Sequence, residues 1–451
     1  MKTTLKSTVT YPEGHVLLRN LTKNYPVVSH GKGVYLYDTA GKRYLDGAGG
    51  ALVSSVGHGN EEVAQEIFEQ MRRVPYVNGQ QFTSPVMESF ADRLAALAPK
   101  GLDRVALLSS GSEAIEAAVK FVRQLWVERG QPQKSKLIAR NPGYHGNTLY
   151  ALSASARPHY KKLFGPLLSD VLMIEAPYGY RSPVDYETKG ADYYAQALSK
   201  CIEENGAENI MAFVFEPIIG SSAGGSTPPP GYYEKVSEIC KKNNILMIAD
   251  EILCGTGRTG KFFACEHYNI EPDVLVLGKG INGGMVPMSV VMVKDEHIQE
   301  IKKGTGYFMH AQTYLQSPSM AAAGLAVLRY MEKNQLVKNS EDMGAYLHLQ
   351  LKKEIAPHPN VGAVAGKGLL AGVEFVNDRD TKKPFDRSKK VTESFVSKAF
   401  DNGLILWPNV GQADGVNGDL VMLGPPLIIT KAEVDELVAL LKQTLHMEFG
   451  A

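Results

Sequence analysis

Short apolar runs alternate with amphipathic helical patterns through the middle of the chain. The run over residues 245–249 ends in two acids, and the run over residues 274–277 ends in Gly278-Lys279-Gly280. Such short runs, bounded by glycine and polar residues, are typical of strands buried in a parallel sheet, although periodicity alone leaves a buried helix open. Similar alternation over residues 104–293 predicts an α/β fold with a mainly parallel sheet covered by helices on both faces.

After residue 293 the pattern changes to long helices and then to a few strands separated by helices. Apolar runs in 366–375 and 419–429 predict strands, and helical periodicity covers 388–400 and 431–447. We therefore expect three parts. They are an N-terminal segment that packs with the small domain (1–60), a large ligand-binding domain (61–330) and a C-terminal small domain (331–451).

Composition excludes several classes of function. The 48 basic residues balance 48 acidic ones, so no overall field favours nucleic acid or an anionic membrane. The four cysteines lack paired CxxC spacing, which predicts reduced thiols and no metal site. No apolar run approaches the roughly 18 residues of a membrane span, and the first residues lack the apolar core of a secretory signal. We expect a cytoplasmic protein.

Several predicted strand ends carry side chains that suit a phosphorylated ligand. A strand, Ser109-Ser110-Gly111-Ser112 and a helix follow one another, which is how free backbone N–H groups hold a phosphate. Tyr144-His145, Glu216, Asp250 and Lys279 follow later strands. Ligands of open α/β sheets bind outside the carboxyl ends of the strands, so these groups should share one site. Taken singly, each also has an ordinary interpretation as a helix cap, a packing residue or a solvated loop residue.

Lys279 is the least ordinary of these residues. An unpaired ammonium group at a buried strand end is costly, so a lysine flanked by two glycines there is a poor choice for a core. Lysines in such positions are candidates for a Schiff base with a carbonyl compound. Pyridoxal phosphate additionally requires an acid facing its ring nitrogen, and Asp250 is available at a neighbouring strand end.

The chain resembles the class III aminotransferases, in the fold-type I group of pyridoxal-phosphate enzymes. The resemblance covers nearly the whole chain and rests on GSEAIEAA, YHG, FEPI, DEILCGTGRTG with GKG, and HAQTYLQSP followed by a small-residue helix. It implies a large domain with a mainly parallel, seven-stranded-type sheet and a smaller α/β domain. It also implies pyridoxal 5'-phosphate as cofactor and amino-group transfer by a ping-pong mechanism.

The resemblance assigns roles at matching positions. Lys279 would hold the cofactor covalently and then move a proton between substrate and cofactor. Asp250 would keep the pyridine nitrogen protonated. Ser110, Gly111 and Ser112 would bind the phosphate group at their helix start.

Other positions would surround the cofactor ring. Tyr144 would stack on one face with the support of His145, and Ile252 would pack on the other. Thr313 would reach the phosphate of the neighbouring subunit, which implies a homodimer with shared active sites. Arg258, in the GRTG turn, is expected to be structural.

Departures from the family pattern bear on the substrate. Leu253 replaces the glutamine that members acting on 4-aminobutyrate or ornithine usually have, and Asn147 stands where an arginine often grips a distal carboxylate. Both favour the amine or ω-amino acid:pyruvate branch. Ala51 and Leu52 would line the substrate side, where Ala51 leaves room for a bulky amine substituent.

The acceptor carboxylate lacks its usual partner. No arginine follows Arg387, so the C-terminal arginine of many relatives is missing and Glu216, which pairs with it elsewhere, needs another contact. Asn and Ser side chains, backbone groups or an arginine from another segment, such as Arg157, could replace it, since lysine imitates a guanidinium fork poorly.

Three other functions stay open. The first is an aminotransferase for 4-aminobutyrate or another ω-amino acid that uses 2-oxoglutarate. The second is a glutamate-1-semialdehyde-type aminomutase, which would act without an external acceptor. The third is a non-catalytic binding protein, which would need neither Lys279 nor Asp250. A nicotinamide enzyme is disfavoured because no GxGxxG lies between a strand and a helix.

Overall fold

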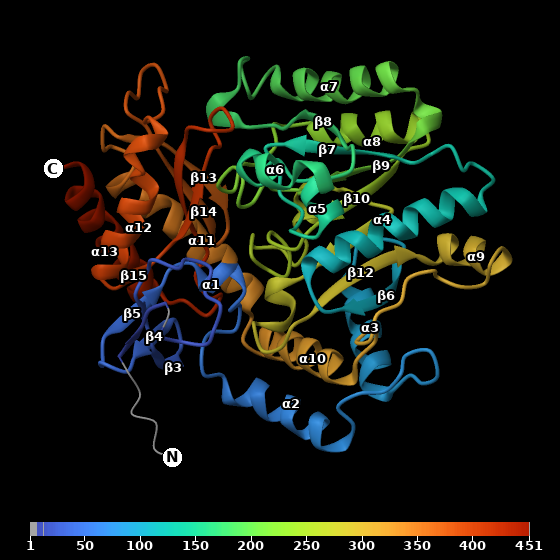
Figure 1. Cartoon of the computed structure of the whole chain (residues 1–451), viewed down its shortest axis with the longest axis horizontal. Helices are drawn as coiled ribbons and strands as arrows, with labels where there is room; N and C mark the ends of the chain where they lie inside the picture. Colours follow the sequence, from blue (N-terminus) through green and yellow to red (C-terminus); the bar gives the residue numbers. More distant parts are fainter. Residues whose placement is uncertain (1–6, 12, 451) are drawn as a thin grey trace.

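A seven-stranded sheet organises the larger half of the molecule in the computed structural model, which describes residues 7–11 and 13–450 (Figure 1). Strand β12 is antiparallel to both neighbours, and the pairs among β11, β10, β9, β7 and β8 are parallel. The mainly parallel sheet is thus confirmed. In spatial order the strands are β6 (Leu102–Leu108), β12 (Ser289–Lys294), β11 (Val274–Leu277), β10 (Leu246–Asp250), β9 (Ile210–Phe215), β7 (Lys136–Asn141) and β8 (Leu172–Glu175).

Helices cover both faces of this sheet, as its apolar strands require. Along β9, Phe213 and Phe215 enter one hydrophobic cluster while Ala212 and Val214 enter another, because side chains alternate between the faces. Residues of α3 (Pro85–Leu97), α7 (Gly190–Asn205), α8 (Tyr232–Lys242) and α10 (Pro318–Lys333) belong to the first cluster. Residues of α4 (Gly111–Glu128), α5 (Leu149–Ser153) and α9 (Asp295–Lys303) belong to the second.

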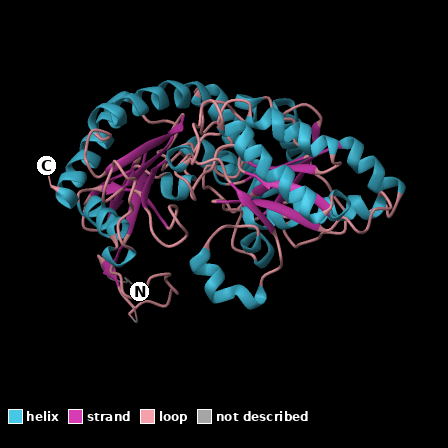
Figure 2. Cartoon of the chain, turned by 90° about the horizontal axis from the view of Figure 1, so that it is seen from above, coloured by secondary structure: helices cyan, strands magenta, loops and turns pink. Residues whose placement is uncertain are grey.

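A second lobe is built from N-terminal and C-terminal segments of the chain, which lie side by side (Figures 1 and 2). One of its two four-stranded sheets has the order β13 (Val361–Lys367), β14 (Leu370–Phe375), β17 (Asp419–Leu423) and β16 (Trp407–Val410). In its other sheet, β15 (Leu404–Ile405) pairs in parallel with β5 (Arg43–Asp46), followed by β4 (Tyr35–Asp38) and β3 (Val28–Lys32). The helices of the lobe are α11 (Leu336–Glu354), α12 (Val391–Asp401) and α13 (Lys431–Phe449).

Most predicted elements are present with shifted ends. Helix α12 begins three residues after the predicted start at 388, and α13 ends two residues after the predicted end at 447. The strand predicted over 419–429 ends at Leu423, because Pro425 and Pro426 cannot donate to a ladder. Short elements that the pattern did not indicate include β1 (Thr8–Val9), β2 (Tyr25–Pro26), α1 (Gly49–Leu52), α6 (Pro158–Phe164) and strands β3, β8, β15 and β16.

Two sequence-based expectations concern the ends of the chain. Residues 1–6, 12 and 451 lie outside the described residues. Residues 1–6 begin the predicted N-terminal segment and belong to the stretch that is expected to lack a secretory signal. Within the described part of the chain, no helix combines the length and the apolar character that crossing a membrane requires.

Asn60 caps the start of α2 (Glu61–Arg73), and its contribution to stability can be measured. Asn60 Oδ1 accepts from Val63 N at 3.1 Å, and its Nδ2 donates to Val56 O. Asn60→Ala should lower the free energy of unfolding by about 1 kcal/mol. Urea unfolding followed by circular dichroism measures this, with Asn60→Asp as the matched control that keeps the acceptor. Equal losses in both variants would contradict the capping role.

Candidate active site

The first part of the site is the start of α4. Ser110 is the N-cap residue: its hydroxyl accepts from Glu113 N, and the Glu113 carboxylate accepts from Ser109 N and Ser110 N. Gly111 and Ser112 are the first two residues of the helix. They line a cavity of about 170 Å³, which Asp250 and Lys279 also line. A Cβ atom at Gly111 would lie 3.0 Å from Ile252 Cδ1, so glycine permits this close approach. The helix start can therefore hold an anion through its free N–H groups and its dipole.

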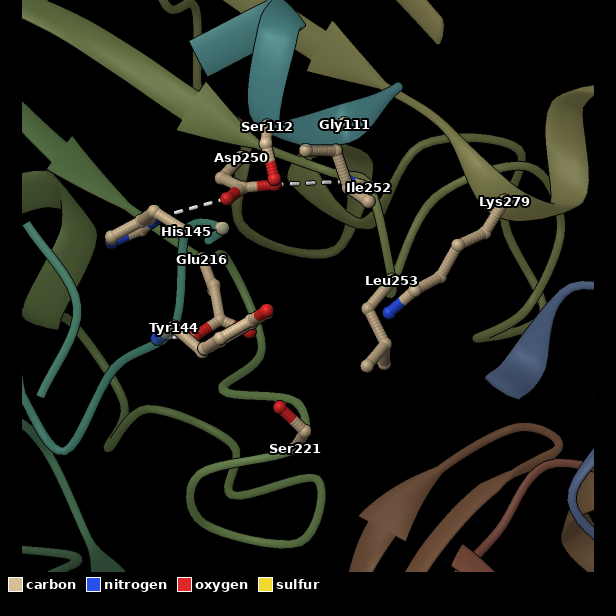
Figure 3. A pocket seen from close by; sticks show the side chains of 11 residues that line it. Gly111, Ser112, Tyr144, His145, Glu216, Ser221, Asp250, Ile252, Leu253 and Lys279 are labelled. Atoms are coloured by element: carbon tan, nitrogen blue, oxygen red, sulfur yellow. Dashed lines mark hydrogen bonds and ion pairs between the residues drawn. The ribbon is translucent and has the colours of Figure 1, made fainter. Parts of the chain in front are cut away.

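Asp250 is the buried acid of the site and the last residue of β10. Its Oδ2 lies 2.7 Å from Nδ1 of His145, and its Oδ1 accepts from Ile252 N at 3.0 Å (Figure 3). His145, which was expected to support Tyr144, is thus in contact with the acid. This contact and the backbone hydrogen bond fix the direction of the carboxylate.

Lys279 follows β11 and begins a short 3₁₀ turn, Lys279–Asn282. Its φ of 47° lies in the left-handed region that non-glycine residues rarely adopt, and such strain is concentrated at functional sites. Nζ forms no hydrogen bond or ion pair with any residue that the structure describes, and it points into the pocket toward Leu253 (Figure 3). Burial lowers the pKa of Lys279, although the nearby Asp250 and Glu216 carboxylates oppose this shift. The side chain is placed as a free amine nucleophile.

Glu216 and Tyr144 form another wall of the cavity. Glu216 accepts hydrogen bonds from Tyr144 N at 3.1 Å and from Gly220 N at 2.8 Å. These backbone groups are its partners in place of the arginine that many relatives have near the C-terminus. Burial raises the pKa of Glu216 and outweighs these hydrogen bonds. Ser221 lines the cavity beside them, and no sequence signal pointed to it.

The structure brings some predicted residues to this cavity and leaves others away from it. Leu52 is buried in a cluster with Leu253, whereas Ala51 lies beside it in the turn of α1, and neither lines the cavity. Thr313 lies in an exposed loop before α10. Roles for these three residues stay predictions. Arg258 is confirmed as structural, since its Nη1 donates to Leu369 O and Pro425 O.

The fold is that of the fold-type I transaminases. The family model described as "Aminotransferase class-III" matches residues 19–445. The chain belongs to the class-III aminotransferases, and it is an enzyme of that family.

Two curated relatives illustrate the similarity. The chain is 41% identical over 431 residues to an uncharacterized aminotransferase, YodT, of Bacillus subtilis (strain 168), covering 96% of this chain and 97% of the relative. It is 35% identical over 433 residues to a putrescine–pyruvate aminotransferase of Pseudomonas aeruginosa, covering 95% and 92%.

Solved structures show the same fold. An (S)-enantioselective omega-transaminase from Thermomicrobium roseum matches with a TM-score of 0.88 and 35% identity, covering 94% of this chain and 93% of that chain. A PLP-bound aminotransferase mutant from Vibrio fluvialis matches with a TM-score of 0.88 and 30% identity, covering 95% and 93%.

The pKa of Lys279 can be tested directly in cofactor-free protein. Because burial lowers this pKa from its ordinary value of 10.5, the neutral amine should predominate at a lower pH than for an ordinary lysine. The pH dependence of dinitrophenylation, measured by mass spectrometry of the Lys279 peptide, should show a midpoint below 10.5. Asp250→Asn should lower the midpoint further, since it removes a negative charge that raises the pKa. A midpoint at or above 10.5 would contradict this electrostatic assignment.

Proposed function

We propose that this aminotransferase uses pyridoxal 5'-phosphate to move an amino group from an amine or ω-amino acid to a 2-oxo acid, with pyruvate as the acceptor. The observation that carries the proposal is one cavity lined by an unpaired lysine amine, an oriented aspartate and a helix N-terminus. These are the three groups that a phosphorylated pyridine aldehyde requires.

The residues of the site fit this cofactor. The N–H groups of Gly111 and Ser112 would bind the phosphate, with Ser110 holding the helix start through its cap. Tyr144 and Ile252 would contact the ring. When bound, pyridoxal phosphate acts as an electron sink that stabilises negative charge on the substrate carbon.

The chain itself supplies proton handling and orientation. Lys279 would bind the cofactor covalently and afterwards carry the proton to and from the substrate, which requires an amine of lowered pKa. Asp250 would keep the ring nitrogen protonated, and His145 would hold the aspartate in place. Glu216 would position the backbone of Tyr144.

Two side chains support an amine or ω-amino acid as donor. Leu253 presents an apolar group to the cavity where a glutamine would be polar. The Ser112 hydroxyl donates to Asn147 Oδ1 at 3.0 Å, so the amide of Asn147 already has a partner. A neutral amide also cannot form an ion pair with a distal substrate carboxylate. The putrescine–pyruvate relative supports pyruvate as acceptor.

We also propose a cytoplasmic homodimer with shared active sites. Several large apolar side chains around the α2–α3 connection and the loop before α10 are exposed in the single chain, as expected of a surface that a second copy covers. They are Phe68, Met71, Tyr76, Phe82, Tyr307, Met309 and Tyr314. In such a dimer Thr313 would contact the phosphate of the partner subunit, and Ala51 and Leu52 would lie on the substrate side. The four unpaired cysteines suit a reducing compartment.

The reaction is tested by mixing the purified protein with single amines and no acceptor. Bleaching of the visible band of the bound cofactor by 1-phenylethylamine, β-alanine or taurine would support the proposed donor class. Bleaching by only 4-aminobutyrate or glutamate would contradict the interpretation of Leu253 and Asn147. Product formation from a single substrate would favour the aminomutase.

The role of Lys279 is tested by substitution. Lys279→Ala should lower kcat by at least roughly 10²- to 10⁴-fold, the usual contribution of a positioned general base. Lys279→Arg, which keeps the positive charge but forms no Schiff base, should be equally impaired. Normal turnover by either variant would refute the mechanism.

The contribution of Thr313 is tested through cofactor affinity. A hydrogen bond to a charged group contributes about 1.5–3 kcal/mol, so Thr313→Ala should weaken cofactor binding roughly 10- to 100-fold. Thr313→Ser keeps the hydroxyl and is the matched control. Fluorescence titration of the cofactor-free protein measures both, and equal affinities in wild type and Thr313→Ala would exclude the contact across subunits.

A further inference from the structure

Arg157 is a partly buried cation without an acidic partner at the edge of the candidate active site. Its Nη2 donates to Ser221 Oγ at 3.0 Å, its Nη1 donates to Asn409 Oδ1, and its guanidinium carbon lies 5.2 Å from the ring centroid of Tyr144. No ion pair joins it to a carboxylate within the described part of the chain. A guanidinium group has five N–H donors, so most remain available. Holding such a charge away from water is unfavourable unless an anion completes the site.

The other arginines nearby are already engaged. Arg140 donates to Glu216 O and Tyr233 Oη, and Arg258 donates to two backbone carbonyl groups. Arg181 pairs with the buried carboxylate of Glu374. Of these four, Arg157 alone combines an unmatched charge with a place beside the cavity.

The charge of Arg157 acts on the reacting groups. It lies close enough to Lys279 to lower the pKa of that amine. Glu216 forms no ion pair with Arg157, and although its charge raises the pKa of Arg157, burial outweighs that effect and the pKa stays below its ordinary value. Ser221, which receives a hydrogen bond from Arg157, itself lines the cavity with Lys279. A substrate anion beside Lys279 would therefore be within the field of this guanidinium group.

Arg157 lines a second cavity, of about 350 Å³, while its hydrogen-bond partner Ser221 lines the first one, of about 170 Å³. Gln412, 8% exposed, lines this second cavity and comes from the loop that takes the place of the expected C-terminal arginine. Although its amide lies beside Glu374, neither amide atom is in hydrogen-bond geometry with a described residue. The loop thus contributes unsatisfied neutral polar groups here, while the positive charge comes from Arg157.

We propose that Arg157 binds the substrate carboxylate, with Ser221 and Asn409 holding its guanidinium group in position. The inference rests on the proposed function, in which that carboxylate belongs to the 2-oxo acid acceptor. Two parallel N–H···O bonds would orient the acid and place its carbonyl carbon toward Lys279. Arg157 is then a specificity-determining residue, because an acceptor without a carboxylate gains nothing from it.

The test compares two acceptors in the holoenzyme with 1-phenylethylamine as donor. The quantity measured is kcat/KM for pyruvate divided by kcat/KM for propanal, an aldehyde without a carboxylate. Arg157→Met should lower this ratio roughly 10- to 100-fold, as expected for a lost charge-assisted bidentate contact. Arg157→Lys keeps the charge but not the fork, and its ratio should lie between those of wild type and Arg157→Met.

Lys162→Met is the matched control, because Lys162 is exposed on α6, the helix that follows Arg157, and its removal changes the net charge equally. Its ratio should equal that of wild type. The ratio also separates recognition from a structural effect: loss of the contact with Tyr144 would slow both acceptors alike. Equal losses for pyruvate and propanal in Arg157→Met, or an unchanged ratio, would overturn the inference while leaving amino transfer intact. Failure of wild type to use either acceptor would instead overturn the proposed function.

Discussion

The balance of buried charge at the carboxyl edge of the central sheet is the constraint on which this site depends. Two carboxylates, Asp250 and Glu216, stand near a lysine amine and a guanidinium group, yet none of the four forms a direct salt bridge with another. The aspartate is held by His145 and the glutamate by backbone N–H groups. Each acid thus keeps its position without a direct ion pair to a cation, although the charges of the acids act on both cations from a distance.

The large sheet makes this arrangement rigid. Strands β9, β10 and β11 are buried along their whole length and covered on both faces, so the residues at their ends move little relative to one another. Groups that must meet a ligand within a fraction of an ångström are best carried by such elements. The left-handed backbone of Lys279 is strain that this framework can maintain.

The second lobe contributes side chains around Arg157 but none that lines the cavity beside Lys279. Asn409 in β16 and Gln412 in the following loop approach Arg157 from the C-terminal segment. Lys279, Asp250 and Gly111 all belong to the large sheet or to the helix that follows one of its strands. The proposed carboxylate site around Arg157 therefore draws on both lobes, whereas the cavity beside Lys279 is lined by the larger half alone.

The sequence by itself determined the sheet, most helices and the strand-end positions of Asp250 and Lys279, because apolar runs and their polar ends are local patterns. It missed the short strands β3, β8, β15 and β16, whose two to five residues carry too little periodicity.

Only the tertiary structure decided that His145 contacts Asp250 and that Glu216 accepts hydrogen bonds from backbone N–H groups. It also showed that Arg157 meets Ser221 and Asn409, which lie 64 and 252 residues away in the chain. Contacts over such separations depend on how the elements pack in three dimensions, and a single sequence carries no local signal for them.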